Sequence, residues 1–154
     1  MYEPIRTKSV HTMAAAPEIP HRSREQELDI RLAGQLTALL TVTDELHALA
    51  TRADGAADQD TGPDGAALDG AALAAAAERI AEQVARLSGG HYPLRAEPTE
   101  GGTPARTDAL QQRAHTLAGN ALAVATTRAD TAVMELAGER MAAHAAPLRD
   151  LATA

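Results

Sequence analysis

Asp44 and His47 have the spacing that comes nearest to a metal site. They lie three positions apart in a segment with helical periodicity, so a helix would place the carboxylate and the imidazole on one face. A di-metal bundle would need further carboxylates and a second such pair from other helices. Leu46 and Leu49 form the apolar seam of the same segment, which directs both polar side chains toward solvent. We therefore expect this pair to lie on a solvated face.

Glu135 and Glu139 form a second pair of acidic residues, and a histidine follows them at His144. The gap of five residues between Glu139 and His144 turns the imidazole well away from the carboxylate on a helix. His91 and His115 are single histidines, and a lone histidine usually has only a local hydrogen-bond partner. We expect an ordinary polar face and no histidine metal site.

Four aspartates, Asp58, Asp60, Asp64 and Asp69, alternate faintly like the ligands of a calcium loop. If Asp58 is the first ligand, Pro63 stands where the sharp turn of such a loop requires glycine. Asp69 then stands where a longer, bidentate glutamate normally closes the cage. The sequence favours an acidic linker here.

Nucleotide binding and nucleophilic catalysis receive no support from the residue pattern. The glycines at positions 62, 65, 70, 89 and 90 follow no predicted strand, and no GK[ST] sequence is present. The chain has no cysteine, which excludes disulfides and thiolate chemistry, and no serine lies in a nucleophile elbow. The sequence therefore predicts neither an enzyme nor a cofactor.

Aromatic residues are almost absent, because Tyr2 and Tyr92 are the only two. Alanine, the commonest residue, is the strongest helix former and adds only a methyl group to a core, so helices can approach closely but bury little apolar area per residue. The formal net charge of -7 and the single lysine, Lys8, disfavour nucleic acid and anionic membrane surfaces. No apolar run approaches the ~20 residues of a membrane span. We expect a cytoplasmic protein.

Apolar periodicity predicts an all-α domain preceded by an irregular arm at residues 1–22. No alternating pattern is long enough to indicate a strand. The single domain, residues 23–154, is predicted to be an antiparallel three-helix bundle with an alanine- and leucine-rich core. Its helices are expected at 23–54, 69–88 and 104–146, and its loops at 55–68 and 89–103.

The predicted helix starts have recognisable capping residues. Ser23 followed by Gln26 forms a capping box, and Asp69 is a plausible cap for the second helix. Thr103 with Pro104 at the first helical position opens the third helix, where proline loses no helical hydrogen bond. The loop before Thr103 is long enough to cross one end of the bundle.

The third predicted helix has two apolar faces and no proline before Pro147. Unbroken, it would reach roughly 60 Å, which exceeds the other two helices. It must then bend near Gly119–Asn120 to give a four-helix arrangement, protrude, or be covered by a second copy of the chain. The two stripes that define its faces are Leu110, Ala114, Leu117, Ala121 and Val124, and Leu122, Ala125, Ala129, Ala132 and Leu136.

Two amides lie on or beside apolar stripes: Gln35 on the seam of the first predicted helix, between Leu32 and Leu39, and Asn120 beside a stripe of the third. A buried amide can fix the register between helices at some cost in stability, as a polar residue does in a coiled coil. The alternative is that both are partly exposed. The sequence leaves the two interpretations open.

The second apolar face of the third helix favours covering by another molecule. We therefore predict a non-enzymatic protein that acts through self-association and protein–protein interaction, as a homodimer with a helical protein as a further partner. The alternative is a bundle that binds a metal or a small apolar ligand in its core. The residues expected to form the partner-binding surface are Leu117, Leu122, Val124, Val133, Leu136 and Met141.

Overall fold

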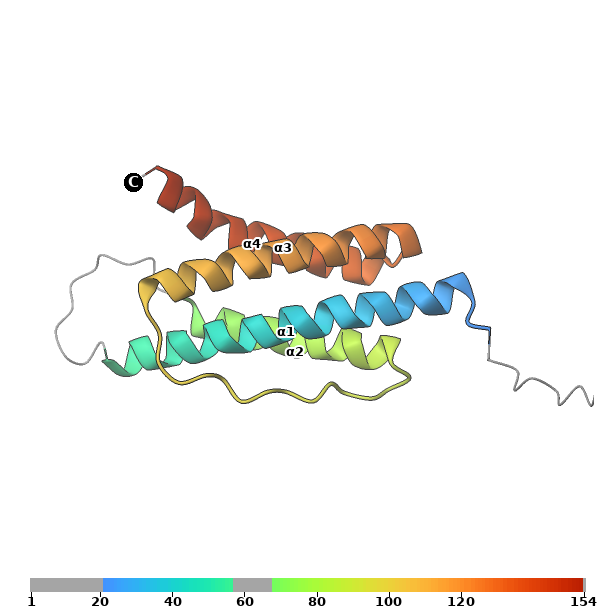
Figure 1. Cartoon of the computed structure of the whole chain (residues 1–154), viewed down its shortest axis with the longest axis horizontal. Coiled ribbons are helices and arrows are strands. Elements are labelled where there is room, and N and C mark those ends of the chain that lie inside the picture. Colours follow the sequence, from blue (N-terminus) through green and yellow to red (C-terminus); the bar gives the residue numbers. More distant parts are fainter. Residues whose placement is uncertain (1–20, 57–67, 154) are drawn as a thin grey trace, which may run out of the picture.

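The computed structural model describes residues 21–56 and 68–153. In these ranges α1 packs on α2 and on α3, and α3 packs on α4, whereas α2 and α4 meet only sparsely. Figure 1 shows the helices lying side by side in two layers. The all-α bundle is thus confirmed, in its four-helix form. The helices found in the described residues, which contain no strand, are α1 (Arg24–Ala56), α2 (Gly70–Leu87), α3 (Pro104–Arg128) and α4 (Thr131–Ala152).

The first three helices begin with the predicted capping chemistry. The Ser23 N–H donates to Gln26 Oε1 at 2.9 Å, and the Gln26 N–H donates to Ser23 Oγ at 3.2 Å, which is a reciprocal capping box. The Asp69 and Thr103 side chains each accept a hydrogen bond from the backbone N–H three residues later. Pro104 occupies the first turn of α3.

The core combines leucines, mainly from α1, with alanines from the other helices. α1 supplies most of the large buried side chains. On α3 the fully buried positions are all alanine, so at these positions the helix adds only methyl groups to the interior. Among the buried residues are Leu32, Leu36, Leu39, Leu40, Val42 and Leu46 of α1, Leu73, Ile80 and Val84 of α2, Ala114, Ala118, Ala121 and Ala125 of α3, and Val133 and Leu136 of α4.

The predicted third helix is in fact two helices. α3 ends at Arg128, Ala129 takes a left-handed conformation with φ 59° and ψ 36°, and α4 begins at Thr131. Gly119–Asn120, where a bend was expected, lie inside α3 and do not interrupt it. A glycine lowers helix propensity but ends a helix only where a cap can satisfy the free backbone groups. At the end of α3 the backbone N–H groups of Ala129 and Asp130 donate to the carbonyls of Thr126 and Ala125, and the Asp130 side chain caps the start of α4.

Asp130 also fastens this turn to α2. Its carboxylate accepts hydrogen bonds from Arg86 at 2.6 Å and from the Val133 N–H at 3.2 Å. Burial alone would raise the pKa of Asp130, but these two bonds and the nearby arginines outweigh it and hold the pKa below its ordinary value. Because the chain reverses here, α4 itself covers the second apolar face of α3. A second copy of the chain is not required for that purpose.

Replacing Ala129 by glycine is expected to raise the free energy of unfolding by about 0.5 to 1 kcal/mol. Ala129 is the one non-glycine residue with positive φ in the described part of the chain. A Cβ on a residue in the left-handed region costs roughly 1 to 2 kcal/mol. Glycine removes this cost but loses more backbone entropy when the protein folds, so the net gain in stability is smaller. Urea denaturation followed by circular dichroism measures the change. Ala123→Gly, in the exposed middle of α3, should have the opposite sign, and a destabilised Ala129→Gly variant would contradict the prediction.

Residues 88–103, which we call the strap, connect α2 to α3 and differ from the expected loop. The strap runs along the length of the bundle instead of crossing one end, as Figure 1 shows. The reason is topological: α2 and α3 point in the same direction, so the chain must return the full length before α3 can begin.

The last turns of α4 diverge from α3 (Figure 1). The sequence predicted that the helix would end at residue 146, but α4 continues through Pro147 to Ala152. Proline has no N–H to bond to the carbonyl four residues earlier, and its ring clashes with that carbonyl, so such a helix bends at proline instead of staying straight. No helix in residues 21–56 and 68–153 has both the length and the apolar character needed to cross a bilayer.

Candidate functional site

A cleft with a volume of about 1170 Å³ lies at the end of the bundle where α1 and α4 finish and α2 and α3 begin. It exists because α2 and α4 barely touch, and because the end of α4 turns away from its neighbours. The large apolar residues among its lining are Leu49 of α1, Leu68 just before α2, Leu73 of α2, and Pro147 and Leu151 of α4.

Two buried polar side chains, Gln111 of α3 and His144 of α4, lie at the inner part of this cleft. His144 is only 2% exposed, and its Nδ1 lies 2.6 Å from Gln111 Oε1. Because an amide oxygen can only accept, Nδ1 carries the proton and donates it. Burial, the nearby Arg140 charge and His115 lower the pKa of His144 to about 4, so the ring is neutral at pH 7. Its Nε2 is then a bare acceptor, and it is buried with no hydrogen-bond partner among the described residues.

Arg140 stands one helical turn before His144 on the same face of α4 and also lines the cleft. It is 7% exposed, and its Nε has no hydrogen-bond partner in the described part of the chain. Its ion pair with Glu139 is long, at 3.7 Å, because Glu139 binds Arg79 at 2.8 Å. Burial, opposed only in part by Glu139, lowers the pKa of Arg140. A buried guanidinium without a close carboxylate costs several kcal/mol, so this position favours an incoming anion.

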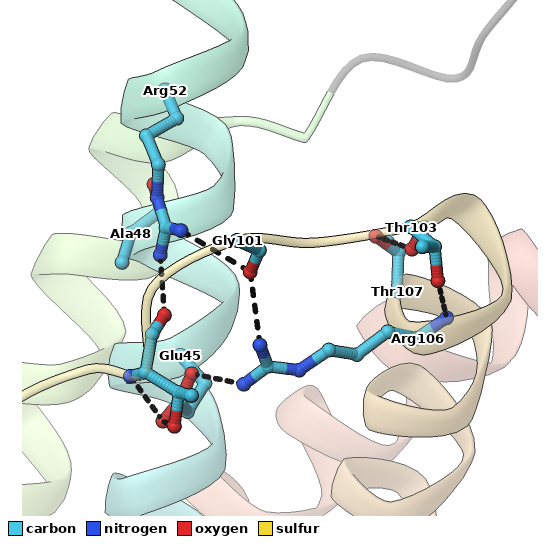
Figure 2. Close-up of polar contacts among 8 residues, drawn as sticks. Glu45, Ala48, Arg52, Gly101, Thr103, Arg106 and Thr107 are labelled. Atoms are coloured by element: carbon cyan, nitrogen blue, oxygen red, sulfur yellow. Dashed lines mark hydrogen bonds and ion pairs between the residues drawn. The ribbon is translucent and has the colours of Figure 1, made fainter.

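The strap supplies one wall of the cleft, and a polar network fixes it there, as Figure 2 shows. Arg52 of α1 donates to the carbonyls of Thr99 and Gly101 at 3.0 and 3.2 Å. Arg106 of α3 donates to Gly101 O at 2.9 Å and to Glu45 Oε2 at 2.7 Å. Burial would raise the pKa of Glu45, but hydrogen bonds from Thr99 and the two arginines lower it overall. Side chains of α1 and α3 therefore together hold this part of the strap in place.

Asp44 was expected on a solvated face, and this expectation is wrong. The strap covers Asp44, and Arg95 of the strap binds its carboxylate, with Nε to Oδ2 at 3.0 Å, while also pairing with Glu78 of α2. These bonds raise the pKa of Arg95. The neighbouring His47 places Nδ1 3.0 Å from the Gly70 carbonyl oxygen. Both residues of the pair thus hold chain segments together, which periodicity within one helix could not reveal.

The six residues predicted to bind a partner divide into two groups. Val133 and Leu136 are buried in the chain's own core, because α4 folds back on α3. The other four are half-buried and pack against that core from its edge. These four are Leu117, Leu122, Val124 and Met141.

Most of the other positions considered from the sequence are exposed or have a local structural role. Glu135 and Glu139 are exposed, as expected for a polar face, but this expectation is wrong for His144, which is buried between α4 and α3. Asn120 is exposed, while Gln35 is half-buried and has an Oε1 atom with no partner among the described residues. Asp69 caps α2, and the other aspartates of the acidic linker, at 58, 60 and 64, lie outside the described residues. Within residues 21–56 and 68–153, no group of three or more histidines and carboxylates is arranged to hold a metal.

Sequence reasoning missed the convergence of Gln111, Arg140 and His144. A signal was available, because Val133, Leu136, Arg140 and His144 continue one stripe with spacings of three and four. Two polar residues therefore follow the apolar ones on the buried face of α4. Their meeting with Gln111 depends on the turn at Asp130, which was not predicted.

The fold and the site can be set beside known proteins. No family model matches the chain, and comparisons with curated proteins and with solved structures also give no match.

Proposed function

We propose that this chain is a non-enzymatic helical binding protein, and that its end cleft takes up a small, largely apolar molecule. The observation that carries the proposal is the inner part of the cleft, where Arg140 and His144 are buried with hydrogen-bonding atoms unused. Native proteins satisfy nearly all buried polar groups, so an unpaired group in a cleft points to a missing binding partner.

The dimensions and chemistry of the cleft support a small ligand. Ligand pockets typically enclose about 300 to 1000 Å³, are mostly apolar, and contain a few placed polar groups. The cleft has about 1170 Å³, with leucine side chains at its walls and polar atoms of Gln111, Arg140 and His144 at its inner part. This corresponds to the ligand-binding alternative from the sequence, with the ligand at one end of the bundle.

A tryptophan reporter tests the proposal directly. The chain contains no tryptophan, so Leu151→Trp, which is half-exposed beside the cleft, gives a single fluorescent side chain. Titration with octan-1-ol, an uncharged apolar molecule, should produce a saturable blue shift. Adding Ala143→Phe, which places a ring into the cleft, should weaken binding at least about fivefold because it occupies ligand volume.

Ala142→Phe is the matched control, because Ala142 is equally exposed on α4 but does not line the cleft. This variant should bind octan-1-ol like the parent protein. A linear, unsaturable response, or equal binding by the two phenylalanine variants, would exclude the cleft as a binding site.

We also propose, as a second function, self-association of the chain as a homodimer in the cytoplasm. Its support is the partial exposure of apolar side chains on both flanks of the buried alanines of α3 and on α4, namely Leu117, Leu122, Val124 and Met141. A groove between α1 and α3, lined in part by Leu28 and Val124, lies on the flank that holds Leu117 and Val124. Light scattering coupled to size exclusion measures the oligomeric state. A protein that stays monomeric at high concentration would contradict this second proposal.

A further inference from the structure

We infer that the ligand of the cleft is an amphiphile with one carboxylate group, and that Arg140 binds this group. The inference deepens the proposed function and depends on it, since it names the chemical class of a molecule that must first enter the cleft.

Arg140 provides the charge that selects the head group. Its guanidinium is buried at the inner part of the cleft, and its nearest carboxylate, Glu139, is 3.7 Å away and shared with Arg79. A planar guanidinium presents a fork of N–H donors that matches the two oxygens of a carboxylate. A carboxylate placed here would give the buried cation a close partner, which is the condition for such a charge to be tolerated.

His144 adds a complementary acceptor one turn away. Because its Nδ1 donates to Gln111, its Nε2 offers a lone pair toward a ligand. An ionised carboxylate has only acceptor atoms, so it binds Arg140, and Nε2 remains an acceptor for a donor group elsewhere on the ligand. An alcohol lacks the charge that Arg140 requires.

The charges around the cleft disfavour more than one negative charge on the ligand. Four aspartates line the cleft together with Arg52 and Arg140; they are Asp54, Asp69, Asp108 and Asp150. Because the aspartates outnumber the two arginines, the second charge of a phosphate ester would add repulsion that the arginines do not balance. A monoanionic carboxylate with an apolar tail places its charge at Arg140 and its tail against the leucines.

The test compares octanoate with octan-1-ol, using the Leu151→Trp reporter in the full chain at pH 7. We expect octanoate to bind at least about tenfold more tightly than the alcohol, because a charge-assisted hydrogen bond in a buried site is stronger than a neutral one. Arg140→Met should reduce this ratio to about one. Arg140→Lys, which keeps the charge, should retain at least about threefold preference.

Arg149→Met is the matched control, because Arg149 is exposed on α4 and does not line the cleft. This variant should keep the full preference for octanoate. If both ligands bind the parent protein equally, or if Arg140→Met keeps the preference, the inference is overturned while the proposed function stands. If neither ligand binds, the proposed function itself fails. Circular dichroism verifies that each variant is folded, and Arg140→Lys supplies the comparison should Arg140→Met not fold.

Discussion

The free energy of unfolding is expected to fall by about 3 kcal/mol between pH 7 and pH 4 through His144 alone. The folded-state pKa of His144 is about 4, whereas its ordinary value is 6.5. At pH 7 the ring is mostly neutral in both states and contributes little to the pH dependence. As the pH falls below 6.5, His144 becomes protonated in the unfolded chain but stays neutral in the folded chain. The free energy of unfolding therefore decreases progressively down to pH 4.

The contribution of His144 is isolated by comparison with His144→Gln, which has no group that titrates in this range. Urea denaturation of both proteins at several pH values gives two stability curves. The acidic residues with lowered pKa, Glu45 and Asp130, keep their stabilising effect above their unfolded pKa values and lose it at lower pH, equally in both proteins. The parent curve should fall more steeply, by about 3 kcal/mol in total. Parallel curves would show that His144 titrates normally and is not held in a buried, neutral form.

Replacing Ala121 by leucine is expected to lower the free energy of unfolding by about 3 kcal/mol. Ala121 is fully buried on α3, between Ala118 and Ala125, which are also fully buried. A leucine at this position adds three carbon atoms where α3 meets α1 and α4, and an interior packed at crystal-like density has no room for them without backbone shifts. Urea denaturation at pH 7 measures the loss.

Ala109→Leu is the control for this substitution. Ala109 lies on the exposed side of the same helix, where a leucine should change the stability by no more than about 0.5 kcal/mol. Equal effects at the two positions would mean that the alanine stripe of α3 does not set the spacing of the helices. A neutral Ala121→Leu variant would imply a cavity at this point.

Periodicity and capping chemistry predicted most of the fold, because both are local in sequence. The leucine stripe of α1 and the caps at Ser23, Asp69 and Thr103 each depend on residues within one or two helical turns. The turn at Ala129–Asp130 was not predicted, because it contains no glycine or proline and is stabilised by Arg86 from a different helix. The strained left-handed conformation of Ala129 is stabilised by tertiary contacts, which the sequence pattern does not show.

The candidate site was harder to predict than the fold for the same reason. His144 was weighed against Glu139 on its own helix, and the five-residue gap correctly argued against that pair. Its actual partner, Gln111, lies on α3 and meets it only after the chain has reversed at Asp130. Asp44 was similarly misjudged, because the strap that buries it comes from a distant part of the sequence. The His144–Gln111 pair and the Asp44–Arg95 pair both form through contacts between different elements. The residue pattern of a single helix therefore could not predict them.

The attachment of α4 has a mechanical consequence for the opening of the cleft. The helix is held along most of its length, because Asp130 is bonded to Arg86 of α2, Glu139 to Arg79 of α2, and His144 to Gln111 of α3. Its last turns diverge from α3 (Figure 1), and Leu151 in this part is half-exposed. The outer wall of the cleft is therefore the least packed part of α4, while the opposite walls belong to α1, α2 and the strap. A small change in the angle of these last turns would alter the width of the opening without disturbing the leucines of α1.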